Sequence, residues 1–445
     1  MHQRSELKRQ LGLPTATALV VGEVIAVGIF LTPAGMAKSL GSPFWLLSVW
    51  IVMGLMALCG ALCYGELAAR FPAAGGGYVY LREAYGPAVA FLYGWMAFLV
   101  MDPGITAALA IGMAGYAGYS LGLSPSGMKV VAIAAIILVA AINIRGVKLG
   151  GWLIRWLTLL KLGMLLFILL WGFALRLGDW GNFAPFIPQR EGSLPLFGAL
   201  AGATVAAFFS FGGWWDVTKL AGEVRDPART LPRALAYGVI IVTLVYILTS
   251  AVFIYLVPLD RVSSGETFAA QAGEALFGRV GGQVFSAVVI VAVLGSLAGI
   301  IMSAPRVYFA MARDGLFIPA AATLQARYGT PARAIVLQAA LASLLVALGT
   351  FDQIVSYFIF VVVIFIALTV AAIFVLRQRT TAESDYLTPG YPATPIIFLL
   401  LIALLLFLLG AHNPKQALMG IVVVALGLPF YYLIFRRTQA AQKPD

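Results

Sequence analysis

The stretch GEVIAVGIFLTPAG, residues 22–35, places three glycines in an apolar run that otherwise suits a membrane helix. A second stretch, FFSFGGWWDVTKLAGE at residues 208–223, carries a double glycine between aromatic residues. Glycine in the middle of an apolar segment predicts either close helix packing or a helix that unwinds halfway across the membrane. Two interrupted segments at corresponding positions in two halves of one chain favour the unwound helices.

The composition around these stretches is that of a membrane protein. Of the 445 residues, 62% are apolar and only 11% are charged, against roughly 25% charged in an ordinary soluble domain. A chain of this length therefore has too few charged residues for a soluble surface. Two cysteines and two histidines exclude a disulfide scaffold and a metal centre built from several of these residues.

Apolar runs long enough to cross a bilayer, about 20 residues each, predict an all-α integral membrane protein with twelve transmembrane helices. No segment has the alternating pattern of a membrane β-barrel. The predicted spans are 15–38, 44–70, 86–120, 128–143, 150–176, 196–223, 231–257, 277–312, 331–349, 353–376, 393–410 and 416–435. The two interrupted spans then each begin a set of five helices, 15–176 and 196–376, followed by two additional helices in 393–435.

The basic residues predict the orientation. With the N-terminus inside, 21 of the 29 Lys and Arg residues, Lys219 and Arg306 among them, fall in the predicted cytoplasmic segments. Seven fall on the opposite side, and Lys161 lies inside a span. Lys and Arg concentrate on the cytoplasmic side of membrane proteins, so residues 1–14 and 436–445 are expected to be cytoplasmic. The net charge of +11 then reflects topology and gives no reason to expect a nucleic-acid partner.

Five motifs occur in order along the chain. They are VGIF at 27–30, YGELAARFPAAGGGYVYLREAYGP at 64–87, NIRGVKLGGWLIRWLTLLK at 143–161, FSFGGWWDVTKLAGEVRDPARTLPRA at 209–234 and SAPRVYFAMARDGLFIP at 303–319. Together they resemble the amino acid–polyamine–organocation (APC) superfamily of permeases, in particular the L-type and cationic amino acid transporter branches. The resemblance extends from residue 12 to about 376, and the last two spans match only in character.

The resemblance implies a LeuT-like fold of five-plus-five inverted repeats, with the first and sixth helices broken, and transport of amino acids by alternating access. It implies that amides at the first break hold the substrate carboxylate, as helix N-termini can, and that carbonyls at both breaks hold the ammonium. Phe209 or Phe211 would form an aromatic lid over the substrate. The chain departs from the family pattern at Trp215, where a small polar residue is more usual, and the indole there suggests a shorter or differently shaped side-chain pocket. The implied substrate-binding residues are Val24, Val27, Gly28, Ile29, Phe209, Ser210, Phe211, Gly212 and Trp215.

Lys161 stands near the middle of the span 150–176. A lysine at this depth costs several kcal/mol unless it faces a polar interior. The resemblance implies that its ammonium takes the place of a bound cation and steadies the first span, which makes transport independent of sodium. Whether this lysine also loses its proton during transport stays open at this point.

Three carboxyl groups also fall inside the predicted spans, and each is a candidate functional group by default. They are Glu23, Asp102 and Asp216. They could pair with Lys161 or share a proton with each other, bind the positive group of a substrate, or carry a coupled proton. The acidic residues near the cytoplasmic arginines are instead expected to form salt bridges or to cap helix ends: Glu66, Glu83, Glu223, Asp226 and Asp314.

The sequence thus predicts a sodium-independent secondary transporter of amino acids, acting by proton-coupled symport or by exchange. An alternative is a transporter of cationic amino acids, polyamines or organic amines that uses Glu23 and Asp102, and a non-transporting amino acid sensor is less favoured. An enzyme is not expected, because the chain has no HExxH, Asp-rich or nucleotide-binding motif. We expect no cofactor, no metal and no obligate partner subunit, and a location in the inner membrane of a cell.

Overall fold

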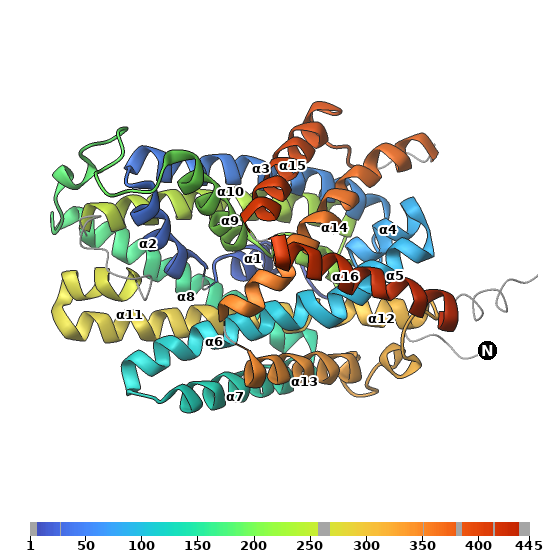
Figure 1. Ribbon diagram of the computed structural model, residues 1–445. Helices are drawn as coiled ribbons and strands as arrows, with labels where there is room; N and C mark the ends of the chain where they lie inside the picture. Colours follow the sequence, from blue (N-terminus) through green and yellow to red (C-terminus); the bar gives the residue numbers. More distant parts are fainter. Residues whose placement is uncertain are drawn as a thin grey trace, which may run out of the picture.

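A computed structural model describes residues 7–26, 28–256, 268–349, 351–379, 385–412 and 414–435. These residues form a bundle of helices (Figure 1). The helices of the first half are α1 (Leu13–Val24), α2 (Gly28–Leu40), α3 (Pro43–Arg70), α4 (Gly77–Tyr85), α5 (Pro87–Met96), η1 (Ala97–Met101), α6 (Asp102–Leu121), α7 (Pro125–Ile144), α8 (Val147–Ala174) and η2 (Trp180–Phe183). Those of the second half are α9 (Leu196–Phe211), η3 (Asp216–Glu223), α10 (Pro227–Leu256), α11 (Phe268–Ser303), α12 (Pro305–Arg313), η5 (Pro319–Ala322), α13 (Ala332–Leu348), α14 (Phe351–Arg379), α15 (Ala393–His412), α16 (Pro414–Phe430) and η6 (Tyr431–Phe435).

The described residues include nine helices that are long and apolar enough to cross a bilayer. Three shorter apolar helices overlap ranges that the sequence predicted as spans: Leu13–Val24, Ala332–Leu348 and Ala417–Leu433. The first of these is short because its span is divided into α1 and α2. The all-helical, multi-pass membrane character predicted from the composition is therefore confirmed.

Proline marks where many of these helices begin. Pro43, Pro87, Pro125, Pro227 and Pro305 each stand at the start of a helix. Proline suits this position because the first helical N–H groups have no partner within the helix and the ring already holds a helical φ. At Pro43, Pro87, Pro125 and Pro227 the observed starts lie close to predicted ones, whereas Pro305 divides the predicted span 277–312 into α11 and α12.

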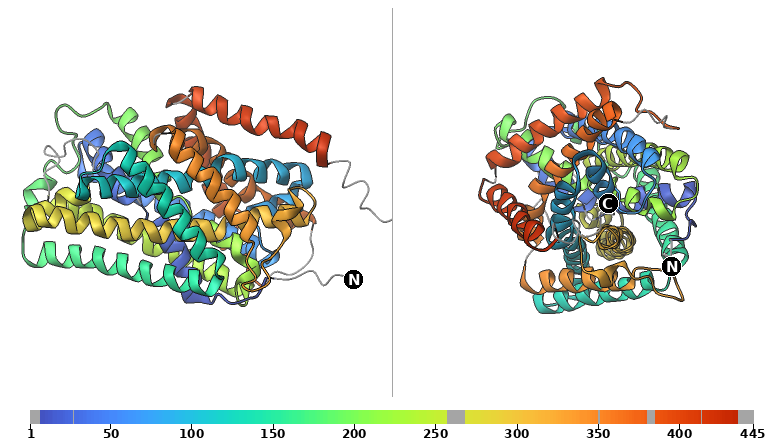
Figure 2. Two further views of the ribbon diagram at one scale, coloured as in Figure 1. Left: turned by 90° about the horizontal axis from the view of Figure 1, so that it is seen from below. Right: turned by 90° about the vertical axis from the view of Figure 1, so that its right-hand side faces the viewer.

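Helix α1 lies at the centre of the bundle. It packs against α8, α10 and α11, and its residues from Leu19 to Val24 are buried. In contrast, α7 and α8 carry exposed apolar side chains, such as Leu138 (61% exposed) and Trp152 (59%), as expected for helices that face lipid. Figure 2 shows the bundle from its right-hand end, where several helices are seen end-on. The interrupted first span therefore lies inside the protein, away from lipid.

One long predicted span, 86–120, has an irregular turn near its middle. Within the range 86–120, residues Ala97–Met101 form a π-helix turn that ends directly before Asp102. Pro103 follows, and it lacks the N–H that a regular helix would use at this point. Such π-turns often occur at functional positions. Here the turn places Asp102 at the start of α6, in the interior of the bundle.

Candidate functional site

The first span is interrupted between α1 and α2. Helix α1 ends at Val24 and α2 begins at Gly28, while Val27 lies outside the described residues. Because α2 begins here, the N–H groups of its first turn have no partner within the helix. The positive end of the α2 dipole points to the same place. The break therefore presents donors suited to a negatively charged group.

The sixth span is interrupted at the double glycine. Helix α9 ends at Phe211, and the chain turns through Gly212 and Gly213 before the 3₁₀ helix η3. Gly213 has φ of 105°, a backbone conformation that is accessible to glycine and strained for other residues. The double glycine is thus required by the turn, and both interruptions expected from the sequence are present.

The two breaks lie directly against each other. A methyl group added at Gly28 would lie 2.7 Å from Cα of Ser210, closer than real contacts allow. The hydroxyls of Thr32 and Ser210 are 2.8 Å apart. Glycine at position 28 is therefore needed for the contact between α2 and α9, in addition to any contribution from its N–H group.

Tyr246 of α10 joins the two breaks, a contact that no sequence pattern indicates. Its hydroxyl lies 2.7 Å from the carbonyl oxygens of both Val24 and Ser210. A hydroxyl has a single proton, so it donates to only one of the two carbonyls at a time. These are two of the positions that the resemblance implied for the substrate ammonium. Val24 and Ser210 are thus the acceptors of a buried tyrosine in this conformation.

Lys161 reaches the end of α1 from α8. Its ammonium donates to the carbonyls of Gly22 (2.9 Å) and Ile25 (2.7 Å), and to the hydroxyl of Ser296 (3.1 Å). The side chain is 1% exposed. Its three hydrogen bonds match its three N–H donors. The lysine thus occupies a cage of oxygen atoms and stabilises the unwound end of α1.

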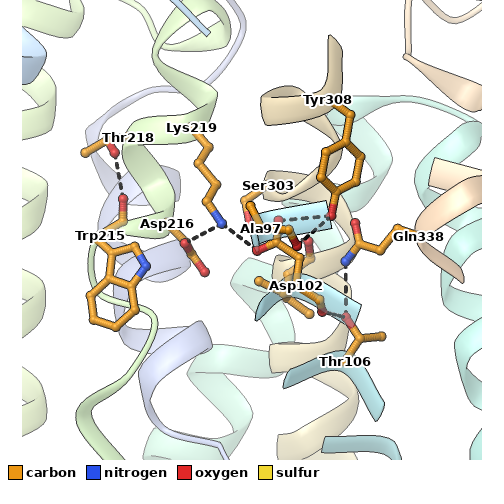
Figure 3. Close-up of polar contacts among 11 residues, drawn as sticks. Ala97, Asp102, Thr106, Trp215, Asp216, Thr218, Lys219, Ser303, Tyr308 and Gln338 are labelled. Atoms are coloured by element: carbon orange, nitrogen blue, oxygen red, sulfur yellow. Dashed lines mark hydrogen bonds and ion pairs between the residues drawn. The ribbon is translucent and has the colours of Figure 1, made fainter. Parts of the chain in front are cut away.

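A second buried lysine, Lys219, lies in η3, shortly after the second break. The Lys219 ammonium is 2.9 Å from Oδ1 of Asp102 and 2.8 Å from Oδ1 of Asp216, and Tyr308 donates to the second oxygen of Asp102 at 3.0 Å. Figure 3 shows Lys219 pointing between the two carboxylates. The suggested pairing of Asp102 with Lys161 is therefore wrong, because α6 faces η3 and Lys161 faces α1.

The assignment of Lys219 and Arg306 to the cytoplasmic connections is also wrong. Both side chains are 1% exposed and both lie within helices. The guanidinium of Arg306 pairs with Glu223 at 2.7 Å. The count of basic residues treats every lysine near a span end as exposed, and it cannot recognise acidic partners on other helices.

Glu23 is buried without a well-formed hydrogen bond. Its side chain is 7% exposed, and neither carboxyl oxygen has a hydrogen-bond partner among the described residues. Gly299 of α11 makes room for it, since a methyl group there would lie 2.5 Å from Cγ of Glu23. The nearest polar groups are the side chains of Ser303 and Asp216. This carboxyl group is therefore the least compensated of the charged groups near the breaks.

A narrow cavity adjoins the second break. It has about 20 Å³ of free space, room for one or two water molecules. Phe209, a predicted lid residue, lines the cavity, whereas Phe211 packs against Trp50 and Tyr246. The lining consists of Met101, Asp102, Ile105, Phe208, Phe209, Gly212, Trp215, Asp216, Ile300 and Val362. The protein is thus in a closed form here, with two carboxylates and several aromatic rings around the remaining space.

Salt bridges connect the helix ends on the predicted cytoplasmic side. Glu66 pairs with Arg70 (3.1 Å) and Arg377 (2.6 Å), and Arg82 pairs with both Glu83 and Asp314. The salt bridges expected of these acids, and of Glu223, are therefore confirmed. The remaining acid of this group, Asp226, stands directly before α10 with φ of 43°.

Tyr78 extends this cluster of salt bridges by donating to Asp314 at 2.8 Å. Burial and the neighbouring Asp314 carboxylate raise the pKa of the Tyr78 hydroxyl well above its ordinary value. The hydroxyl therefore stays protonated and available as a donor. Among the residues that the structure describes, no group of three or more His, Cys, Asp and Glu side chains could hold a metal ion.

Known proteins resemble this chain over almost its whole length. The profile of the family described as Amino acid permease matches residues 11–431. The serine/threonine exchanger SteT of Bacillus subtilis is 34% identical over 442 residues, which cover 97% of this chain and 98% of the exchanger. The human b(0,+)-type amino acid transporter 1 is 27% identical over 99% of this chain and 91% of its own length. The human large neutral amino acids transporter small subunit 2 is 28% identical over 96% and 80%.

The matches extend through both breaks, the lysine of α8 and the last two helices. They agree with the five motifs and with the helical membrane architecture. The chain therefore belongs to the amino acid permeases of the APC superfamily, in the branch of the L-type and cationic amino acid transporters.

Proposed function

We propose that this protein is a sodium-independent secondary transporter of amino acids that works by alternating access. The observation that carries the proposal is the direct contact of two helix breaks, Gly28 against Ser210, beside a cavity at Gly212. Unpaired N–H groups at the start of α2 suit a carboxylate. Carbonyls at both breaks suit an ammonium once Tyr246 gives one of them up.

The proposed architecture has twelve spans in two inverted sets of five, 15–176 and 196–376, with two further helices in 393–435. Both termini are cytoplasmic, and the protein lies in the inner membrane. During the cycle the helices that carry the two breaks rock against the others and expose the site to each side in turn. The chain functions without an obligate partner subunit.

Lys161 supports sodium independence. Its ammonium already fills a cage of three oxygen atoms at the end of α1. A sodium ion at the same place would compete with an ammonium group that is attached to α8. We therefore expect counterflow to be unchanged when choline replaces sodium in the buffer, and a loss of more than half of the activity in choline would contradict this point.

The cavity supports neutral amino acids as the main substrates. Two carboxylates line it, but Lys219 already neutralises part of their charge. A neutral side chain can enter without disturbing that ion pair. The name of the Bacillus relative, a serine/threonine exchanger, agrees with small neutral substrates. Cationic amino acids or amines are the second candidate, because Asp102 and Asp216 both face the cavity.

Counterflow in liposomes tests this function. The purified chain alone is reconstituted into liposomes loaded with unlabelled serine, leucine, lysine or putrescine, and uptake of the same labelled compound is measured. We expect accumulation of a neutral amino acid above that of empty liposomes. Uptake of lysine or putrescine alone would favour the second candidate, and no uptake of any compound would contradict transport by this chain.

Two glycines of α2 provide a matched test of the site. A methyl group at Gly28 collides with the backbone of Ser210, whereas a methyl group at Gly35 meets nothing within 4 Å. Gly28→Ala should weaken amino acid binding by about tenfold or more, because α2 and α9 are forced apart by an overpacked contact. Gly35→Ala should bind as the wild type does. Equal affinities for both variants, measured by competition in counterflow, would argue against this location of the site.

A further inference from the structure

The interior around the breaks holds an unequal number of acidic and basic groups. Among the described residues at this place, Glu23, Asp102 and Asp216 are acidic, and Lys161 and Lys219 are basic. All five side chains are at most 7% exposed. Isolated charges at such depth are expensive. One negative charge must therefore be neutralised by something other than the lysines.

The contacts of both lysines are made to groups other than Glu23. Lys161 directs its three donors to two carbonyls and a hydroxyl, none of them a carboxylate. Lys219 lies between Asp102 and Asp216, and the second oxygen of Asp102 accepts from Tyr308. Neither lysine donates to Glu23. The excess negative charge is therefore located at Glu23 and its neighbour Asp216.

The surroundings of Glu23 favour its protonated form. The helices and turns packed around α1 bring toward it Lys161 from α8, Tyr246 from α10, Ser303 from α11, and Asp216 with Lys219 from η3. No side chain among these donates a well-formed hydrogen bond to its carboxyl oxygens. An ionised carboxylate without donors costs several kcal/mol in such a place. A protonated carboxyl group needs only an acceptor, and Asp216 is beside it.

The position of the cavity favours a proton over a larger cation as the group that compensates the negative charge at Glu23. Asp216 lines the cavity and Glu23 does not. A substrate ammonium in the cavity could contact Asp216, but the backbone turn at Gly213 stands against Glu23 on that side. A proton is small enough to reach Glu23 when the bundle opens. The position of Glu23 behind Asp216 therefore suits a proton.

We propose that Glu23 is the coupled-proton site of this transporter, sharing one proton with the carboxylate of Asp216. Asp216 connects the two events, because it contacts the shared proton on one side and the substrate cavity on the other. The proton neutralises the interior while the site is closed, and it exchanges with water when the site opens. This inference rests on the proposed function and adds to it the residue that carries the proton.

The first test measures proton movement. Liposomes that enclose a pH-sensitive dye receive an inward gradient of the amino acid that wild-type protein transports by counterflow. The wild type should acidify the interior, and the uptake rate should depend on external pH. Glu23→Gln keeps the shape and retains an N–H group that can donate to Asp216, but it cannot release a proton, so its counterflow should lose pH dependence and its acidification should be lost. Glu191→Gln changes an exposed carboxyl group and should behave as the wild type.

A second test does not require transport. Infrared spectroscopy of the wild type in detergent at neutral pH should detect the C=O stretching band of a protonated carboxylic acid, and Glu23→Gln should lack that band. The proposal is overturned if the band persists in Glu23→Gln, or if that variant keeps wild-type acidification. It is also overturned if wild-type counterflow is active without any proton movement, a result that leaves the proposed amino acid transport intact.

Discussion

Lys161→Ala is expected to reduce amino acid counterflow by about 100-fold or more. Leaving a buried acceptor without its donor costs about 1–3 kcal/mol for each group, and every 1.4 kcal/mol corresponds to a tenfold change in an equilibrium. In this protein the groups that lose their hydrogen bond to the ammonium are the carbonyls of Gly22 and Ile25 and the hydroxyl of Ser296. These hydrogen bonds hold the end of α1 in place. The substrate-binding form of the first break is then no longer stabilised.

The measurement is counterflow in liposomes with equal amounts of inserted protein. Lys161→Met separates charge from packing, because methionine fills a similar space, and it should be as inactive as the alanine variant. Lys38→Ala removes an exposed lysine of α2 and serves as the control. Elution of each variant as a single species shows that the protein is folded. Wild-type rates in a folded Lys161→Met variant would contradict the role given to this ammonium.

The second large effect is expected at Lys219, on stability. Lys219→Met leaves the carboxylates of Asp102 and Asp216 buried without their cation, at a cost of about 3–5 kcal/mol. The apparent melting temperature should fall by about 5–10 °C. Because the cause is an uncompensated charge, replacing both carboxylates as well, with Asp102→Asn and Asp216→Asn, should recover a large part of the loss. A triple variant no more stable than Lys219→Met would show that charge compensation is not the reason.

The two breaks could be predicted from sequence because glycine is the physical requirement for them. Gly213 needs its positive φ, and Gly28 needs the absence of a side chain against Ser210. Both are local properties that leave a visible mark in an apolar run. The same holds for the helix starts marked by proline, and for Lys161, whose burial follows from its position in the middle of a span.

Partners across helices could not be predicted in this way. Asp102 and Lys219 are 117 residues apart in sequence, and they meet because α6 and η3 both pack against α11. Tyr246 gave no signal, because a tyrosine in an apolar helix is common and carries no charge whose burial would be costly. The position of Glu23 inside a span is visible in the sequence. The lack of a donor to its carboxyl group depends on the packing of α11 against it, for example at Gly299. The partners of the charged groups are therefore decided by tertiary packing, whereas the positions of the two breaks are decided by local sequence.

The central claim is that an amino acid binds between the two breaks, with its carboxylate at the start of α2. A cryo-electron microscopy structure of the protein with a transported amino acid tests this most directly. We expect density for the substrate between α2 and Gly212, with its carboxylate within hydrogen-bond distance of the N–H groups of Gly28 and Ile29. Density for the amino acid elsewhere, for example in the pocket lined by Arg9 and Arg313, with the space between the breaks filled by side chains, would contradict the claim.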